Sequence, residues 1–360
     1  MRKLKIGIIG CGGIARQKHL PSLKANEEFE TVYYCIRAFV PKARIGGGAI
    51  FVYDNMEIFE AFVSGWSKRS CCPDFISIWI FAYELLKDGM RKKVFRVLPE
   101  AEYVSRKVKK AIQIMKKYDL ARIPVYVTQW DLSLSSRNFI NESCYRGVYI
   151  LKSVIDTISE TSIMACSGST DLLCDFYDSI GFIFGGRGLI TINKLKKPAY
   201  YACEFLQQME KYLIDRGENY LVTTDAEDKY AIIIFNISRI DMELYKKKGE
   251  NIAPDDIREL FENDELKVRL QLRNIRNGAY LIRQRSLSCE SGDIINGWES
   301  LGYKKRFNKE ELHYLQAVST PKMNYRNREV SDNALSLVAA LKTNEIQLYQ
   351  IECTNKENRR

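Results

Sequence analysis

A polar amide stands at the end of a strand-like stretch of the sequence. Residues 125–127 form an apolar run, which continues into the tetrapeptide TQWD at 128–131. The side chain of Gln129 can donate and accept hydrogen bonds, but it cannot act as an acid, a base or a good nucleophile. Trp130 adds an apolar ring face and Asp131 a carboxylate. The stretch is typical either of a catalytic strand end that has lost its carboxylate or of one that never had one.

Two further candidates stand near the ends of other predicted strands. Trp79 closes the apolar run 74–79, and Asp171 follows the run 162–167. In barrels of parallel strands, ligand-binding groups gather at the carboxyl ends of the strands. The indole rings of Trp79 and Trp130 could stack on a sugar face, although filling the core is an equal alternative. Asp131 and Asp171 could orient a ligand, with helix capping or simple solvation as the alternative.

The first residues carry a different signal. Gly10, Gly12 and Gly13 lie between the apolar run 4–9 and a helix-like stretch, in the pattern GxGxxA. In a dinucleotide-binding fold such glycines let a pyrophosphate approach the helix N-terminus. With KHLPSL at 18–23, the first 37 residues resemble the start of the Gfo/Idh/MocA family of sugar oxidoreductases, which implies NAD(P) as a cofactor.

The residues after the glycine motif argue against that cofactor. The second strand ends in Arg37, where an acidic residue should hold the ribose, and the next 100 residues contain no Glu-Lys-Pro. A lone glycine motif is weak support for a nucleotide site. We therefore expect no cofactor, and keep an NAD(P)-dependent oxidoreductase as an alternative only.

Bulk composition narrows the classes of partner. The 360 residues are 46% hydrophobic, and the formal net charge is +10. The densest helical cluster of positive charge, 105–117, is amphipathic, with an apolar face and a solvated basic face, so we expect no nucleic-acid partner. No run of 18 apolar residues occurs, so we expect no membrane span.

The number and spacing of the cysteines and histidines indicate reduced, free thiols. Ten cysteines are sparse for a chain of this length, and only two histidines, His19 and His313, occur far apart. We expect neither a disulfide scaffold nor a metal site. The apolar stretch after the basic N-terminus is too short for a secretion signal, which needs about 7–15 apolar residues. Together these features predict a cytoplasmic protein.

Apolar and helical patterns alternate through the first half. Strands are expected at 43–47, 74–79, 124–128 and 162–167, with helices near 55–66, 101–118 and 142–158. This alternation predicts parallel βα units, and four units make half of an eightfold barrel. A half barrel has open sheet edges, so either the N-terminal βαβ segment covers one edge or a second copy completes the barrel as a homo-oligomer. We expect oligomerisation or poor solubility.

After about residue 200 the pattern changes to strands. They are expected at 220–224, 230–236, 267–274, 279–286, 334–341 and 346–352. Asn277-Gly278 is a hairpin signal, and short helices are expected at 254–262 and 309–318, the second with a capping box of Asn308 and Glu311. This predicts an antiparallel β-sandwich. The full expectation is α/β plus all-β: a Rossmann-like opening at 1–40, a partial (β/α)8 TIM barrel at 41–212 and a β-sandwich domain at 213–360.

Several stretches together resemble glycoside hydrolase family 39, the β-xylosidase family. They are PKARIGG at 41–47, DFISI at 74–78, VYVTQW at 125–130, GGRGL at 185–189 and KKPAYYA at 196–202, with Arg137, Asn141, Cys144 and Tyr145. They are similar to the fifth to eighth barrel strands of that family and the segments after them. The resemblance extends over about 41–352.

The resemblance implies a retaining hydrolase of carbohydrates with two catalytic glutamates. One lies in an Asn-Glu-Pro motif on the fourth strand, and the nucleophile lies in Thr-Glu-Trp on the seventh. Gln129 occupies the nucleophile position, and no Asn-Glu-Pro occurs in the sequence. Trp79, Ser167 and Phe184 also stand where the family carries other residues. This predicts a catalytically impaired, β-xylosidase-like protein with a xyloside-like carbohydrate as ligand.

Three alternatives remain open at this point. Gln129 could instead be a relic without a selected role. An active β-xylosidase with substitute carboxylates would need a second acid pair, for which Asp131, Asp171 and Glu84 are the candidates. A sugar sensor is the third, because some relatives in the family are fused to DNA-binding helix-turn-helix segments.

Overall fold

The chain forms two compact units. The computed structural model describes residues 36–52, 56–87, 93–97, 100–132, 137–166, 168–171, 181–248 and 252–354. The glycine motif of Gly10, Gly12 and Gly13 lies outside the described residues. The first unit comprises the chain up to Leu98 together with Tyr103–Asp131 and Thr157–Cys166. The second comprises Pro99–Glu102, Leu132–Asp156 and the chain from Ser167 onward.

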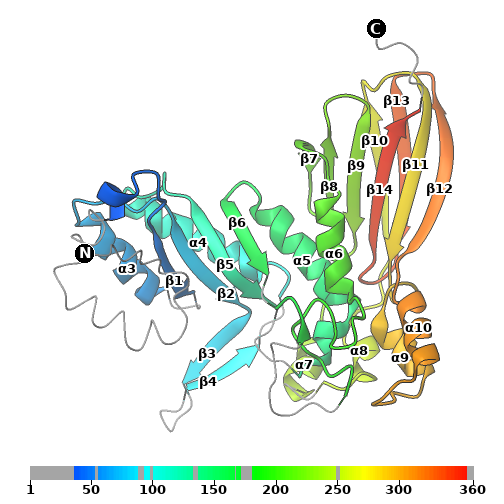
Figure 1. Ribbon diagram of the computed structural model, residues 1–360, viewed down its shortest axis with the longest axis horizontal. Helices are drawn as coiled ribbons and strands as arrows, with labels where there is room; N and C mark the ends of the chain where they lie inside the picture. The colour runs from blue at the N-terminus through cyan, green and yellow to red at the C-terminus, as the bar shows by residue number, and fades with distance from the viewer. Residues whose placement is uncertain are drawn as a thin grey trace. The chain divides into compact units, whose positions relative to one another are not determined.

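The first unit is built on a parallel sheet. Its strands are β1 (Gly47–Phe51), β2 (Ile76–Phe81), β5 (Val125–Asp131) and β6 (Thr161–Cys166), in the order β1-β2-β5-β6. Helices α3 (Glu57–Ser67) and α4 (Tyr103–Lys117) alternate with them along the chain (Figure 1). The parallel βα arrangement expected from the sequence is therefore present. A short antiparallel hairpin of β3 (Tyr83–Lys87) and β4 (Lys93–Val97) follows β2 and was not predicted.

Burial explains why these segments form these elements. Five of the six residues of β2 are buried, as expected for a strand covered on both faces. In α4 the buried residues Val104, Val108, Ala111 and Met115 recur at helical spacing and form the apolar face. At the C-terminal end of α4, Lys117 Nζ lies 2.6 Å from Glu60 Oε1 of α3, so an ion pair also links these two helices at the surface.

The first strand begins later than the sequence predicts. We expected a strand at 43–47, but β1 starts at Gly47 and runs to Phe51. Gly47 and Gly48 have φ of 138° and 109°, a region that favours glycine. The glycines therefore lead into the strand rather than closing it, which the sequence pattern alone does not show.

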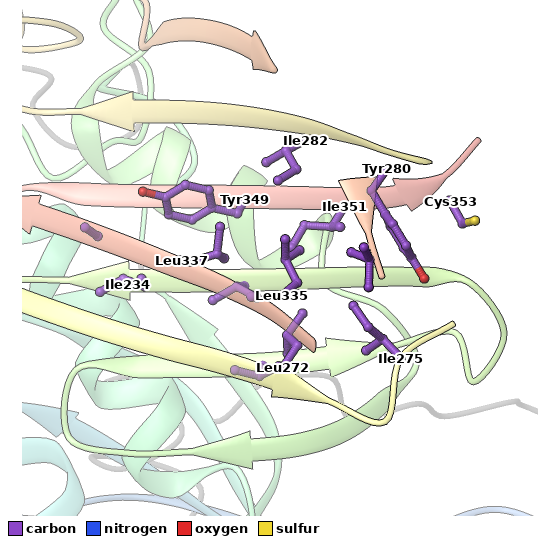
Figure 2. Packing of buried hydrophobic residues seen from close by; sticks show 14 of the residues in the cluster. Ile234, Leu272, Ile275, Tyr280, Ile282, Leu335, Leu337, Tyr349, Ile351 and Cys353 are labelled. Atoms are coloured by element: carbon purple, nitrogen blue, oxygen red, sulfur yellow. The ribbon is translucent and has the colours of Figure 1, made fainter. Parts of the chain in front are cut away.

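The second unit contains a β-sandwich. Its six-stranded sheet has the order β12-β11-β14-β9-β8-β7, and β10 pairs with β13 in a second sheet. The bounds are β7 Tyr212–Arg216, β8 Tyr220–Thr224, β9 Lys229–Phe235, β10 Leu266–Arg273, β11 Gly278–Leu287, β12 Lys322–Val330, β13 Ala334–Leu341 and β14 Ile346–Cys353. Figure 2 shows Leu272 and Leu335 of the smaller sheet in one buried cluster with Ile234 and Ile351 of the larger. The predicted α/β plus β-sandwich fold is confirmed.

The predicted hairpin at Asn277-Gly278 is wrong. The strand before it, β10, pairs with β13, whereas the strand after it, β11, pairs with β12 and β14. Asn274 and Gly278 both have positive φ, so the segment does turn. Ile275 between them is 2% exposed and belongs to the core cluster. The turn therefore carries the chain from one sheet to the other across the core.

Helices precede the sandwich or lie between its strands in the sequence. They are η2 (Phe139–Glu142), α5 (Cys144–Thr157), α6 (Pro198–Gln207), α7 (Met242–Lys248), α8 (Asp256–Glu259), α9 (Ile294–Ser300) and α10 (Lys309–Val318). The predicted capping box of α10 is present, since Asn308 and Glu311 bond each other's backbone N–H. Within the described parts of the chain, no helix combines the length and apolar character needed to cross a membrane.

Candidate functional site

A β-bulge shapes the carboxyl end of β5. Ile78 pairs with Val127 in register, but the next residue of β2, Trp79, pairs with Gln129. One extra residue, Thr128, is thus inserted on the β5 side. The pairing of β5 with β6 is irregular over the same residues. Bulges of this kind redirect side chains beside functional sites, and here the bulge places Gln129 opposite Trp79.

Trp79 is held in place by the bulged residue. Its indole Nε1 donates a hydrogen bond to Thr128 Oγ1 at 3.1 Å. Thr128 is exposed, while Trp79 and Gln129 are half-buried. An indole ring and an amide therefore lie together at the carboxyl ends of two adjacent parallel strands, where barrel proteins place their ligands. This pair can stack on an apolar face and hydrogen-bond a hydroxyl group.

The other two predicted residues of this strand end are buried. Trp130 and Asp131 are each 1% exposed, and Asp131 pairs in register with Phe81 at the end of β2. The ring of Trp130 is thus buried in the interior. Direct contact of either side chain with a ligand stays a prediction.

Asp171 lies in the second unit, within a closed ionic cluster. The ammonium of Lys197 is 2.9 Å from Glu142 Oε1 and 2.8 Å from Asp171 Oδ2, and all three side chains are 0–2% exposed. Lys197 also donates to the carbonyl of Gly186 at 2.8 Å. Asp171 is therefore not a solvated carboxylate, and its role as a ligand contact stays a prediction.

Glycines at 185–188 let the backbone approach this cluster. The backbone N–H of Gly185 donates to Glu142 Oε1 at 3.0 Å, and that of Gly188 donates to Asp171 Oδ1 at 2.8 Å. A Cβ on Gly186 or Gly188 would collide with Asp171. These glycines thus bring backbone N–H groups to carboxylates of their own chain.

Burial sets the charge balance of the cluster. Desolvation raises the pKa of the Glu142 carboxyl, and the neighbouring Lys197 ammonium opposes that rise. The fully buried guanidinium of Arg146 adds a second cation, because its Nη1 donates to the carbonyl of Gly188 at 3.0 Å. The side chains of Glu142, Arg146 and Lys197 are buried. Their hydrogen bonds to residues 185–188 anchor this loop to η2 and α5.

Sequence reasoning missed Glu142, Arg146 and Lys197. The available signal was charged residues placed at otherwise apolar positions of η2, α5 and the start of α6. Such residues are almost never fully buried unless they are paired. In the described residues, no group of three histidine, cysteine, aspartate or glutamate side chains is arranged to hold a metal ion.

The fold and the strand-end pair define a class: parallel βα units with a polar and aromatic strand end, joined to a β-sandwich. The model of the family described as glycosyl hydrolases family 39 matches residues 25–333. The chain therefore belongs to glycosyl hydrolase family 39.

Individual relatives are distant and longer. A beta-xylosidase of Geobacillus stearothermophilus is 20% identical over 91% of this chain and 61% of its own length. A beta-xylosidase of Caldicellulosiruptor saccharolyticus is 29% identical over 81% and 57%. The crystal structure of a monomeric beta-xylosidase from Caulobacter crescentus superimposes with a TM-score of 0.76 at 18% identity, covering 92% of this chain and 66% of that one. The chain thus spans less than two thirds of these relatives, and the structural likeness shows the fold.

Proposed function

We propose that this chain binds a β-xyloside-like carbohydrate at the ends of β2 and β5 and does not hydrolyse it. The observation that carries the proposal is the half-buried amide of Gln129 opposite the half-buried ring of Trp79, at a bulge in β5. Carbohydrates present both hydroxyl groups and apolar ring faces, which this pair matches. The proposed binding uses no cofactor.

The chemistry of retaining hydrolysis explains the second half of the proposal. A carboxylate must attack the anomeric carbon, and a second carboxyl about 5–5.5 Å away must protonate the leaving oxygen. Gln129, at the position that the family resemblance assigns to the nucleophile, carries no negative charge and is a poor nucleophile. It can still hydrogen-bond a sugar hydroxyl. The names of the two beta-xylosidases support a xyloside as the ligand class.

Binding and turnover are measured separately. Titration with xylobiose, followed by tryptophan fluorescence, is expected to show saturable binding, and an aryl β-xyloside is expected to remain intact. Trp79→Ala should weaken binding by roughly tenfold, because loss of a stacked ring costs about 1–1.5 kcal/mol. Tyr325→Ala, an exposed aromatic residue on β12, serves as the matched control.

Different results would contradict the proposed binding site and the proposed lack of hydrolysis. Clear turnover by the unmodified chain would overturn the claim of impairment. Equal affinity of the Trp79→Ala and Tyr325→Ala proteins would overturn the binding site. Gln129→Glu is expected to keep binding without gaining turnover in this chain, since one of two required carboxyl groups is then restored.

A sensing role is the second candidate. Uncharacterized HTH-type transcriptional regulators of Staphylococcus aureus match 70% of this chain at 18% identity, over 32% of their own length. A module that binds a sugar without cleaving it suits such a role. Light scattering with and without xylobiose tests it: sugar-dependent association between copies is expected, and an unchanged mass argues against sensing through self-association.

A further inference from the structure

A pocket lies wholly within the second unit. It has a volume of about 300 Å³ and is lined by Lys194, Lys196, Tyr201, Glu204, Arg285, Gln316, Ser319 and Thr320. These residues come from the loop before α6, from α6 itself, from β11 and from the end of α10. The volume is at the lower end of the range for small-molecule sites, about 300–1,000 Å³.

Positive charge dominates the lining. Lys194, Lys196 and Arg285 face a single carboxylate, that of Glu204, which leaves a formal charge of +2. Arg285 Nη1 lies 2.7 Å from Glu204 Oε2, so this ion pair uses the carboxylate. Lys196 is farther from the same group, at 3.9 Å, and its ammonium lies over the ring of Tyr200. One carboxylate thus serves both Arg285 and Lys196, and the lining keeps a net positive charge.

Three polar atoms in the lining are buried without a hydrogen bond among the described residues: the acceptor Glu204 Oε2, which lies 2.7 Å from Arg285 Nη1, and two donors. Among the residues that the structure describes, neither Arg285 Nε nor Ser319 Oγ has a hydrogen-bond partner. Arg285 is 9% exposed and Ser319 only 1%. A buried polar group without a hydrogen bond costs about 1–3 kcal/mol, so both donors favour a bound acceptor. Guanidinium and hydroxyl groups are donors that suit a phosphate or carboxylate oxygen.

We propose that this pocket binds a small organic anion, a phosphate or carboxylate carried on a body the size of a monosaccharide. Arg285 and Ser319 donate to the anionic group, and Lys194 and Lys196 balance its charge at the pocket mouth. The ring of Tyr201, which lies beside the Arg285 guanidinium, supplies an apolar wall for the body of the ligand. The site is independent of Gln129 and does not rest on the proposed xyloside binding.

A purely structural role of the Arg285–Glu204 ion pair does not explain why two lysines also line the pocket. Linking α6 to β11 needs only Arg285 and Glu204, yet two further lysines converge on the same pocket. The C-terminal end of α10 nearby would oppose an anion, but Ser319 N and Thr320 Oγ1 bond the carbonyls of Leu315 and Gln316. That reduces the negative character of the helix end.

Titration calorimetry with four probes tests the proposal: inorganic phosphate, a hexose phosphate, a hexuronate and neutral glucose. The hexose phosphate or the hexuronate is expected to bind saturably, and more weakly as ionic strength rises. Which of the two binds more tightly identifies the anionic group. Binding of glucose as tight as that of both anions would overturn the proposal.

Matched variants locate the binding. Lys194→Gln with Lys196→Gln should weaken anion binding by about tenfold, because the two charges that balance the anion are removed. Lys211→Gln, at an exposed lysine outside the pocket, removes one like charge as the control. Ser319→Ala should weaken binding several-fold while leaving the unfolding midpoint unchanged or higher, because the hydroxyl has no partner to lose. Equal affinity in all four proteins would overturn the site.

Discussion

A single ammonium group balances two carboxylates in the interior of the second unit. Lys197 contacts Glu142, Asp171 and the carbonyl of Gly186, and no part of its side chain is exposed. Taking charges out of water is costly, and the cost is offset only while every partner is present. The cluster is therefore a place where one substitution has a large effect.

Lys197→Met is expected to destabilise the protein by about 3–5 kcal/mol, because the buried carboxylates of Glu142 and Asp171 would both lose the ammonium that contacts them. Urea unfolding followed by circular dichroism measures the change. Lys229→Met is the matched control, since its pair with Glu352 spans 3.5 Å at the surface and both side chains are about half exposed. The control should differ from the parent by less than about 1 kcal/mol. A similar midpoint in the two variants would contradict the assigned role of the cluster.

Asp293 gives the protein a pH-dependent stability. Burial raises the pKa of its carboxyl from 3.8 to about 7, even though the backbone N–H of Ile295 donates to it at 2.8 Å. Between about pH 4 and pH 7, the Asp293 carboxyl is therefore protonated in the folded state but ionised in the unfolded state. Stability from this group is therefore greatest below about pH 4 and falls as the pH rises to 7.

Asp293→Asn removes that titration and keeps the N-cap of α9. Between pH 4 and pH 7, the free energy of unfolding should fall less steeply with pH in the variant than in the parent. The two slopes should differ by about 1.4 kcal/mol per pH unit. Denaturant titrations at four pH values measure it. Parallel curves for the two proteins would show that Asp293 is ionised in the folded state.

Sequence could identify only part of the candidate site. Gln129 and Trp79 were found because the end of an apolar strand is visible in the residue pattern, and the structure places them opposite each other. Glu142 and Lys197 were missed because their pairing spans 55 residues and no local pattern records it. Charge pairs at long sequence separation depend on the tertiary fold.

At the scale of elements, most strand positions and the parallel βα order were predicted, whereas the partner strand of β10 was not. The expected bounds of β8 and β13 match the structure, because strand alternation and the burial of one face are recorded in consecutive residues. The hairpin at Asn277-Gly278 failed because a turn sequence fixes backbone direction but not the partner strand. The edge strands β7 and β12 were missed because they are largely exposed, so their residues do not show the alternation that burial of one face produces.

The capping box of α10 gives a prediction at this scale. Asn308→Ala should destabilise the protein by about 1 kcal/mol, because the first-turn N–H of Glu311 loses its acceptor at 2.9 Å. Asn308→Ser, which preserves a capping oxygen, should recover most of the loss. Asn324→Ala on exposed β12 is the control, and urea midpoints compare the four proteins. Equal loss in the alanine and serine variants would argue against capping.

At the scale of the molecule, the chain passes repeatedly between its two units. Residues 132–156 belong to the second unit although they lie between strands of the first. Phe139 stacks on Trp298 and Tyr145 on Phe261, so η2 and α5 pack on segments far along the chain. The division at residue 213 that the sequence predicts therefore separates residues that contact one another.

The sandwich nevertheless has a core of its own. Every residue of its main buried cluster lies between Val222 and Cys353, and both sheets contribute to it. A fragment of residues 211–354, which keeps β7 whole, is therefore expected to unfold cooperatively in urea. A fragment of residues 41–210 should not, because α5 and η2 would lose their aromatic partners.

The sandwich fragment should also expose an apolar face. Ile233, Phe235 and Leu348 are fully buried but alternate with the cluster residues, so they lie on the opposite face of the large sheet. Gly147 of α5 lies close to Ile346 on that sheet, which indicates that helices of the second unit cover the face. The fragment is therefore expected to bind more of an apolar dye per molecule than the full chain and to self-associate in light scattering. A monodisperse fragment with no excess dye binding would show that these helices do not cover that face.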